Sequence, residues 1–432
     1  MLRLVLLLLL LLGATHASHF LGTMMTYYPK QTHADGSVTV SLRYKLGFTS
    51  CYHFDIWSCY GSCGSLPYVQ WDRTLQEVDM EPSGEWCQRE GTVTTVIFPS
   101  SLTQLVFAGG NWIYYIQNNV VSWRALTFVE LGKRSDTRKP NASPQSTIMP
   151  AVRVPSNCQR DYDLMAFDPD GDNVECRFGS DSLYECNPCA PPSILNLSSS
   201  CTLSFNRTNS TSEGQYAVQL VLEDFPKQTI TLTNVHGVQT TKTTSQAISK
   251  VPLQFVLHVD PVVPSCTEGL FLPKFLPPTP ANRAKMSTRV NQPLEISIAA
   301  EAANATISEL LFSGPANVVK NSSGSGNFTL SWTPSVSEEG ESHPICFVVQ
   351  ATLNSEKYHS ELRCVIVQVE LGMVVRVNMK VLTSLSQGGI VNEVVLQKVK
   401  DELVSLGLPS NSSLLLLKSS SALANATAAS GV

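Results

Sequence analysis

The most specific cluster of reactive side chains in this 432-residue sequence is a run of three aspartates. Asp168, Asp170 and Asp172 alternate with Pro169 and Gly171, so three carboxylates lie within five residues around a predicted tight turn. Carboxylate oxygens that converge in this way are typical ligands of a hard cation such as Ca²⁺. The spacing is not that of an EF-hand, because the glycine stands at the fourth loop position instead of the sixth. A calcium site and a hairpin turn with a solvated acidic tip are both open for this segment.

Twelve cysteines form the second set of chemically active residues. Cys346 and Cys364 each begin a strand-like segment with no other cysteine nearby, so we expect them to form a disulfide. The Cys186-x-x-Cys189 pair has a further cysteine on either side and would permit a four-thiolate zinc site. Disulfides are favoured there, because thiols oxidise outside the cell. Connectivity of the earlier cysteines is open, and one option for Cys266 is to pair back across the middle of the chain.

Nine Asn-x-Ser/Thr sequons and a leucine-rich start indicate the secretory pathway. Arg3, an apolar run over residues 4–12 and a Thr15-x-Ala17 cleavage signal predict a signal peptide at residues 1–17. The apolar run is too short for a membrane anchor, which needs about 20 residues. We expect N-glycans at the sequon asparagines, which are Asn141, Asn196, Asn206, Asn209, Asn304, Asn321, Asn327, Asn411 and Asn425.

Aromatic residues are concentrated in the first part of the chain, where five of the six tryptophans lie. Amphipathic rings at a surface bind carbohydrates or proteins, whereas rings on one face of a strand more often fill a core. We expect core positions for most of them. The cysteine-flanked Trp57 and Tyr60 are the candidates for a binding surface.

The elements that must position these groups are predicted to be short strands. Apolar and polar residues alternate over residues 38–46, 216–222, 253–259 and 328–332, with turn residues between them. This pattern is typical of antiparallel β-sandwiches. Near the end of the chain, residues 391–406 are apolar at helical spacing, and strand patterns at 375–381 and 414–417 flank them. The expected fold is therefore mainly β, with tandem antiparallel β-sandwich modules and a small C-terminal α/β (β-α-β) unit.

Proline-rich and polar segments mark the expected module boundaries. After the signal peptide we expect an aromatic- and cysteine-rich β module at 18–138 and a β-sandwich with the aspartate turn at 145–262. A further β-sandwich is expected at 263–370, the β-α-β unit at 371–418 and a disordered tail at 419–432. The segment from Lys139 to Pro150, which carries Asn141, is predicted to be a linker.

Several short motifs are spread over residues 145–370. Ala166-Phe167-Asp168-Pro169-Asp170-Gly171-Asp172 is followed by Gly214-x-Tyr216-x-Val218 and by Glu223-Asp224, and later by Leu330-Ser331-Trp332-Thr333-Pro334 and Cys346-Phe347-Val348. This set resembles the cadherin-like and dystroglycan-type immunoglobulin-like modules of extracellular proteins. The resemblance implies β-sandwich modules in which the acidic turn joins two strands. The module at 263–370 departs from it by lacking this turn, so a continuous inter-module string of calcium ions is not implied.

Charge and motif content exclude several function classes. The net charge of −5 offers no basic field for nucleic acid, and no apolar run after the leader is long enough to cross a membrane. Common hydrolase and phosphate-binding motifs are absent from the sequence. We therefore expect a secreted, non-enzymatic glycoprotein that acts in recognition or adhesion. Its expected partners are extracellular proteins or glycans. A lectin-like protein that binds carbohydrate through the aromatic module is the alternative, an uncharacterised hydrolase is the third hypothesis, and a longer membrane-anchored precursor is open.

Overall fold

The computed structural model describes residues 18–63, 75–100, 103–371 and 389–405. The described residues up to 371 belong to one compact unit, and the helix α2 (Gly389–Ser405) belongs to a second. The fold is mainly β, as the alternating pattern predicts, and α2 overlaps the segment of predicted helical spacing at 391–406. The strands expected on either side of α2 lie outside the described residues. Over the ranges that the structure describes, no helix combines the length and apolar character needed to span a bilayer.

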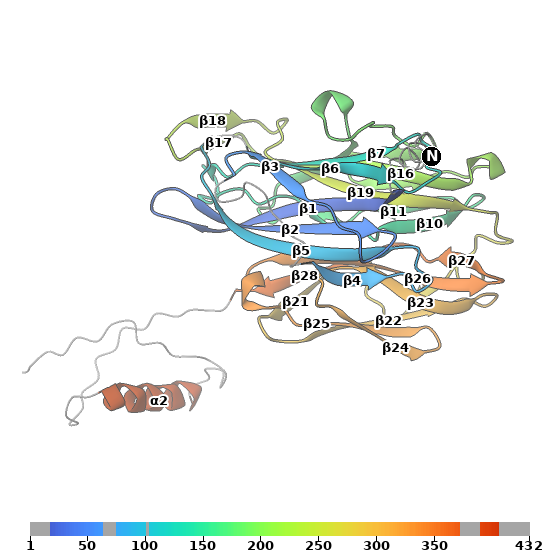
Figure 1. The fold of residues 1–432 in the computed structure, drawn as a ribbon. Coiled ribbons are helices and arrows are strands. Elements are labelled where there is room, and N and C mark those ends of the chain that lie inside the picture. Colours follow the sequence, from blue (N-terminus) through green and yellow to red (C-terminus); the bar gives the residue numbers. More distant parts are fainter. Residues whose placement is uncertain (1–17, 64–74, 101–102, 372–388, 406–432) are drawn as a thin grey trace, which may run out of the picture. The chain divides into compact units, whose positions relative to one another are not determined.

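Eleven strands form one large sheet (Figure 1). Their bounds are β1 (Ser18–Thr32), β2 (Val38–Phe48), β3 (Trp57–Gly61), β4 (Gln76–Met80), β5 (Cys87–Ile97), β6 (Thr103–Trp112), β7 (Ser122–Val129), β10 (Ala151–Pro155), β13 (Asn173–Phe178), β16 (Gly214–Phe225) and β19 (Lys250–Asp260). Neighbouring strands follow the order β13, β16, β19, β7, β6, β1, β2, β5, β4, while β10 pairs with β19 and β3 pairs with β6.

Strands from residues 18–138 and 145–262, which were expected to form separate modules, lie side by side in this sheet. Met24 of β1 is the register partner of Leu253 of β19, and Phe128 of β7 is the partner of Lys250. One hydrophobic core spans both ranges. The boundary predicted between them therefore does not coincide with a break in the structure.

The segment predicted to be a linker is buried. Residues 140–150 are all buried, and several of their polar groups find partners inside the unit. The Ser143 backbone N–H donates to the carbonyl oxygen of Tyr27 at 3.1 Å, and the Tyr27 N–H donates to Ser143 Oγ at 2.8 Å. This segment acts as an internal strap across β1, because buried backbone groups with such partners avoid the cost of desolvation.

Short strands complete the part of the unit around the aspartate turn. β9 (Gln145–Ser146) pairs with β12 (Ala166–Phe167), and β8 (Lys133–Arg134) joins β17 (Ile230–Thr233) and β18 (Gln239–Lys242). A third small sheet contains β11 (Arg160–Asp163), β15 (Thr202–Phe205) and β14 (Leu195–Leu197). β8, β12, β13 and β16 bring together the charged residues of the candidate site.

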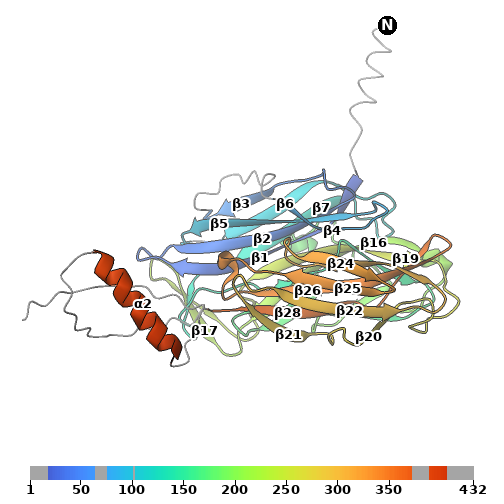
Figure 2. The same ribbon diagram turned by 90° about the horizontal axis from the view of Figure 1, so that it is seen from below.

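A β-sandwich occupies the range predicted for it at 263–370. One sheet contains β20 (Lys274–Leu276), β22 (Leu294–Glu301), β25 (Asn327–Trp332) and β24 (Val319–Gly324). The other contains β21 (Ala284–Arg289), β28 (Arg363–Glu370), β26 (Ser342–Leu353), β23 (Thr306–Ser313) and β27 (Glu356–His359). Figure 2 shows these strands from below. Apolar side chains from both sheets, including Trp332 and Phe347, fill the space between them.

The sandwich packs against the large sheet at β4. Val78 of β4 belongs to the hydrophobic core of the sandwich. The next residue, Asp79, accepts a hydrogen bond from the backbone N–H of Phe312 at 2.9 Å and pairs with the Lys320 ammonium at 2.8 Å. In Figure 1 the sandwich accordingly lies below β5, and β4 is drawn level with β26 and β28. The two parts are thus joined by apolar packing and by buried polar contacts.

All twelve cysteines form disulfides, so none is free. The six pairs are Cys51–Cys87, Cys59–Cys63, Cys158–Cys266, Cys176–Cys201, Cys186–Cys189 and Cys346–Cys364. The last is the pair expected from the sequence, and Cys266 does pair back across the middle of the chain. Because Cys186 and Cys189 are bonded to each other, they cannot supply thiolates to a zinc ion.

Candidate metal centre

The three aspartates predicted as calcium ligands lie on the turn between β12 and β13. Asp168 organises this turn, because its Oδ1 accepts hydrogen bonds from the backbone N–H groups of Asp170 at 2.8 Å and Asp172 at 3.2 Å. Gly171 has a φ of 86°, a left-handed conformation that glycine adopts without strain. The Pro-Asp-Gly sequence therefore folds the turn that holds the carboxylates together.

A fourth aspartate, Asp224 near the end of β16, joins this cluster. One carboxylate oxygen each from Asp168, Asp172 and Asp224 lies within 4.8 Å of the other two. Asp224 is buried, and its Oδ1 accepts hydrogen bonds from the backbone N–H of Ser249 at 2.7 Å and from its hydroxyl at 2.8 Å. The Glu223-Asp224 pair is part of the sequence motif, but it lies more than fifty residues after the turn. Local spacing therefore could not predict that Asp224 contacts the turn.

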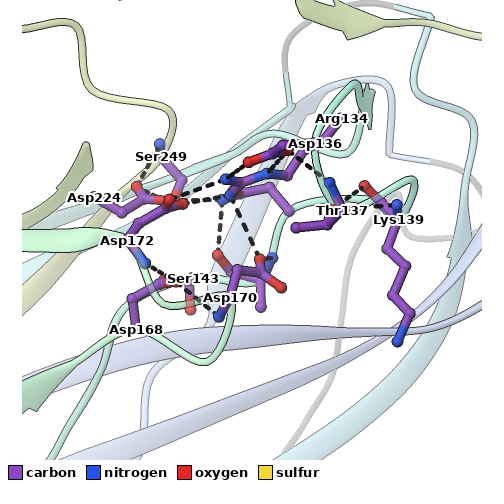
Figure 3. A network of polar contacts seen from close by, with 12 residues as sticks. Arg134, Asp136, Thr137, Lys139, Ser143, Asp168, Asp170, Asp172, Asp224 and Ser249 are labelled. Atoms are coloured by element: carbon purple, nitrogen blue, oxygen red, sulfur yellow. Dashed lines mark hydrogen bonds and ion pairs between the residues drawn. The ribbon is translucent and has the colours of Figure 1, made fainter. Parts of the chain in front are cut away.

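The buried side chain of Arg134 lies inside the same cluster (Figure 3). Its guanidinium forms ion pairs with Asp136 at 2.9 Å, with Asp170 at 3.7 Å and, through both terminal nitrogens, with Asp172. Nη1 also donates to Asn141 Oδ1 at 2.6 Å. No sequence pattern predicts this residue, since β8 reaches the site only through the tertiary fold.

Negative charge exceeds positive charge in this cluster. Its carboxylates come from Asp136, Asp168, Asp170, Asp172 and Asp224, and within the described ranges Arg134 is the one cationic side chain that forms an ion pair with any of them. Figure 3 shows the Lys139 side chain extending away from the group. Asp168 Oδ2 is buried and has no hydrogen-bond partner among the described residues.

Burial, together with the excess negative charge, shifts the pKa of two carboxyl groups. Burial, followed by the negative charges of Asp224 and Asp170, raises the pKa of Asp168 well above its ordinary range. Burial likewise raises the pKa of Asp224, although hydrogen bonds from Asn141 and Ser249 oppose the shift. A cation among these oxygens would keep both groups ionised and would provide the missing partner for Asp168 Oδ2.

The structure changes the predicted ligand set. Asp168 and Asp172 converge with Asp224, whereas Asp170 Oδ2 accepts a hydrogen bond from the backbone N–H of Ala142 at 2.7 Å and faces Arg134. Asp172 belongs both to this set of oxygens and to an ion pair with Arg134. Oxygen ligands of this kind suit Ca²⁺, which accepts carboxylates in flexible geometry.

The sequon at Asn141 lies within this network and is not a surface site. Asn141 has 0% exposure, and its Nδ2 donates to Asp224 Oδ2 at 2.7 Å and to the carbonyl oxygen of Ala142. A glycan bonded to Nδ2 would displace both contacts, so the glycosylation predicted for Asn141 does not fit this structure. The described sequon asparagines on the surface are Asn196, Asn206, Asn209, Asn304, Asn321 and Asn327. Asn411 and Asn425 lie outside the described residues.

The two aromatic binding candidates differ in exposure. Trp57 is 1% exposed and packs against Phe107, with ring centroids 5.3 Å apart. Its assignment to a binding surface is therefore wrong, because its position on β3 points the indole into the core. Tyr60, on the same strand, is 57% exposed.

Comparisons with known proteins leave the family open. No family model matches the chain, and no curated protein matches it. Solved structures with some similarity include an endo-fucoidan hydrolase of glycoside hydrolase family 107 (12% identity, 77% of this chain and 42% of that chain, TM-score 0.19). The fibronectin(III)-like modules of Clostridium thermocellum CbhA have 14% identity and a TM-score of 0.18, and the match covers 53% of this chain and 95% of that chain. Human protocadherin-24 EC1-2 has 13% identity and a TM-score of 0.17, and the match covers 53% of this chain and 99% of that chain. These TM-scores are too low to carry an argument, so the function is argued from the residues.

Proposed function

We propose that this chain is an extracellular protein that acts in recognition or adhesion and has no catalytic role. The observation that carries the proposal is the pairing of all twelve cysteines in six disulfides. Disulfides persist in oxidising compartments and are rare in the cytosol. Six exposed sequons further support passage through the secretory pathway. Partners of this function are extracellular proteins or glycans.

Within this function, the oxygens of Asp168, Asp172 and Asp224 hold a structural calcium ion. The support is the convergence of three carboxylates around one unpartnered oxygen, in a cluster where Arg134 balances a single charge. The ion would tie the β12–β13 turn to β16, two elements that are far apart in the sequence. Its role is stabilisation of the folded unit, because a cation bound by the folded state stabilises that state.

The recognition function is tested with the full chain secreted from animal cells. Labelled protein is added to a panel of cells and to extracellular matrix, and bound label is measured against concentration. We expect saturable binding that unlabelled chain competes away and that the reduced and alkylated chain lacks. Absence of saturable binding by the oxidised chain on every surface would overturn the proposal.

Trp57 is buried and cannot bind a carbohydrate, but other aromatic residues offer a different site for the carbohydrate-binding alternative. Exposed aromatic residues do occur in the first 138 residues, at Tyr114 and Tyr115. They line a cavity that residues from beyond position 150 complete.

A further inference from the structure

An open cavity of about 570 Å³ lies on the unit, and none of the aspartates of the candidate metal centre lines it. Tyr114, on the connection between β6 and β7, lines one side of it, and Glu85 of the β4–β5 turn lines another. Arg153 of β10, Gln215 of β16 and His258 of β19 complete the wall. The volume falls within the range of roughly 300–1,000 Å³ that is common for small-molecule sites.

Two tyrosine rings stand exposed at this cavity. Tyr114 is 63% exposed and Tyr115 is 88% exposed, with their ring centroids 6.2 Å apart. Tyr115 has a φ of 63°, a left-handed conformation that costs free energy in a residue other than glycine. Such strained residues concentrate at binding sites. The connection is fixed, because the Gln117 N–H donates to the Gln215 carbonyl oxygen at 2.8 Å.

Three polar side chains at the cavity, those of Gln117, Gln215 and His258, are neutral and free to bind a ligand. Among the described residues, no hydrogen-bond partner is present for the side-chain amides of Gln117 and Gln215 or for the ring of His258. Burial, followed by the charge of Arg153, lowers the pKa of His258 to about 3, so the imidazole stays neutral at physiological pH. A neutral imidazole and an amide can each both donate and accept a hydrogen bond.

The charged side chains at the cavity are already paired. Arg153 forms ion pairs with Glu85 at 2.5 Å and with Asp260 at 2.6 Å. Glu85 also pairs with the ammonium of Lys357 at 2.7 Å. The charges of this wall therefore balance one another, and an ionic ligand would have to compete with existing partners.

We infer that this cavity binds a neutral oligosaccharide. The apolar C–H face of a sugar ring can lie on Tyr114 or Tyr115, because exposed aromatic rings bury a large area at small entropic cost. Sugar hydroxyl groups both donate and accept hydrogen bonds, as do the amides of Gln117 and Gln215. The inference deepens the proposed recognition function and rests on it for the setting in which the ligand is met.

The test is an array of neutral oligosaccharides together with sialylated and sulfated glycans, probed with the full chain from culture medium. The affinity for each positive neutral glycan is then measured in solution. Tyr114→Ala and Tyr115→Ala should each weaken binding at least tenfold, whereas Tyr115→Phe retains the ring and should retain binding. Tyr52→Ala is the matched control, because Tyr52 is 91% exposed but does not line this cavity.

Thermal melting of each variant separates loss of a contact from loss of the fold. Neutral-glycan binding that disappears in the Tyr114 and Tyr115 variants, at an unchanged melting temperature, supports the site. Absence of array binding, binding that survives both alanine substitutions, or binding restricted to anionic glycans overturns it. Cell binding by the unmodified chain without any glycan signal on the array would reject this site alone. Absence of both cell binding and glycan binding would reject the recognition function as well.

Discussion

Asp168 uses its two carboxylate oxygens differently. Oδ1 accepts two backbone hydrogen bonds and so closes the turn, whereas Oδ2 is buried without a partner among the described residues. A buried carboxylate oxygen without a protein partner leaves room for a water molecule or an ion as its ligand. The nearby oxygens of Asp172 and Asp224 make a cation the ligand that fits.

Chelation of calcium is therefore expected to lower the melting temperature of the full chain. A ligand that binds the folded state at one hundred times its Kd stabilises it by about 2.7 kcal/mol. Asp168→Asn should remove most of the difference between calcium and chelator in a thermal melt. Asp161→Asn, at an exposed aspartate of β11, should leave the difference unchanged. Identical melts of the unmodified chain in calcium and in chelator would contradict the assignment.

Without calcium, the stability that Asp168 and Asp224 contribute is expected to fall as the pH rises. The pKa values of Asp168 and Asp224 are raised in the folded state, so the folded chain binds more protons than the unfolded chain. Their stabilising contribution is complete below the ordinary value of about 3.9 and is lost as the pH rises through the folded-state pKa. Bound calcium removes this loss because it keeps the carboxylates ionised.

The measurement is the melting temperature between pH 5 and pH 8, with chelator and with calcium. Burial also raises the pKa of Asp260 to about 7, which adds a slope of the same sign to both curves. The pKa of His258, lowered to about 3, adds a slope of the opposite sign to both curves below its ordinary value of about 6.5. The readout is therefore the gap between the curves, which should widen with pH. A gap that stays constant or narrows would show that these carboxylates do not hold the ion.

For individual residues of the candidate metal centre, the sequence predicts only those that lie close together along the chain. The Asp-Pro-Asp-Gly-Asp spacing identifies Asp168 and Asp172, because both lie on one turn. Asp224 and Arg134 reach the cluster through strands distant in sequence, and no local pattern marks them as its members. Trp57 was misassigned because exposure on one face of β3 depends on what packs over that face.

Among the elements, β2 and β5 carry a buried charge cluster at the junction with the sandwich. Glu90 of β5 pairs with Arg43 at 2.6 Å and with Lys45 at 2.7 Å, and Lys45 also donates to the carbonyl oxygen of Gly314. Arg43 reaches Glu338 of the sandwich at 3.2 Å. Burial raises the pKa of Glu90, but the charges of Arg43 and Lys45 outweigh it and lower the pKa to about 2.

Glu90→Gln should therefore destabilise the unit strongly. The substitution leaves two buried cations without their shared counter-charge, and breaking a buried pair in this way costs about 3–5 kcal/mol. Arg289→Gln is the control, because the Arg289–Glu370 pair is exposed and such pairs contribute less than about 1 kcal/mol. Urea unfolding curves measure both effects, and equal shifts of the two midpoints would show that the junction does not depend on these charges.

The strands themselves are the most predictable elements. The alternating segments at 38–46, 216–222, 253–259 and 328–332 are confirmed as parts of β2, β16, β19 and β25. Their pairing is less predictable, because β1 and β19 meet across more than 200 residues without a local signal. The strap at 140–150 has the composition of a linker, and only its tertiary partners reveal that it is buried.

For the whole molecule, the continuous sheet predicts that residues 18–138 do not fold alone. Removing the rest of the chain exposes the edge of β1 that faces β19 and uncovers Tyr27, which the strap covers. Circular dichroism and limited proteolysis of this fragment should show an unfolded chain, whereas residues 18–372 should melt cooperatively. A folded, protease-resistant 18–138 fragment would restore the separate module expected from the sequence.

The claim that this chain works outside the cell is tested most directly by the mass of the full chain recovered from the medium of animal cells. The protein is denatured and alkylated without reduction, and its mass and glycopeptides are determined. We predict recovery in the medium, no alkylated cysteine, and glycans on exposed sequons but not on Asn141. Retention of the chain inside the cells, or two or more alkylated cysteines, would contradict the account.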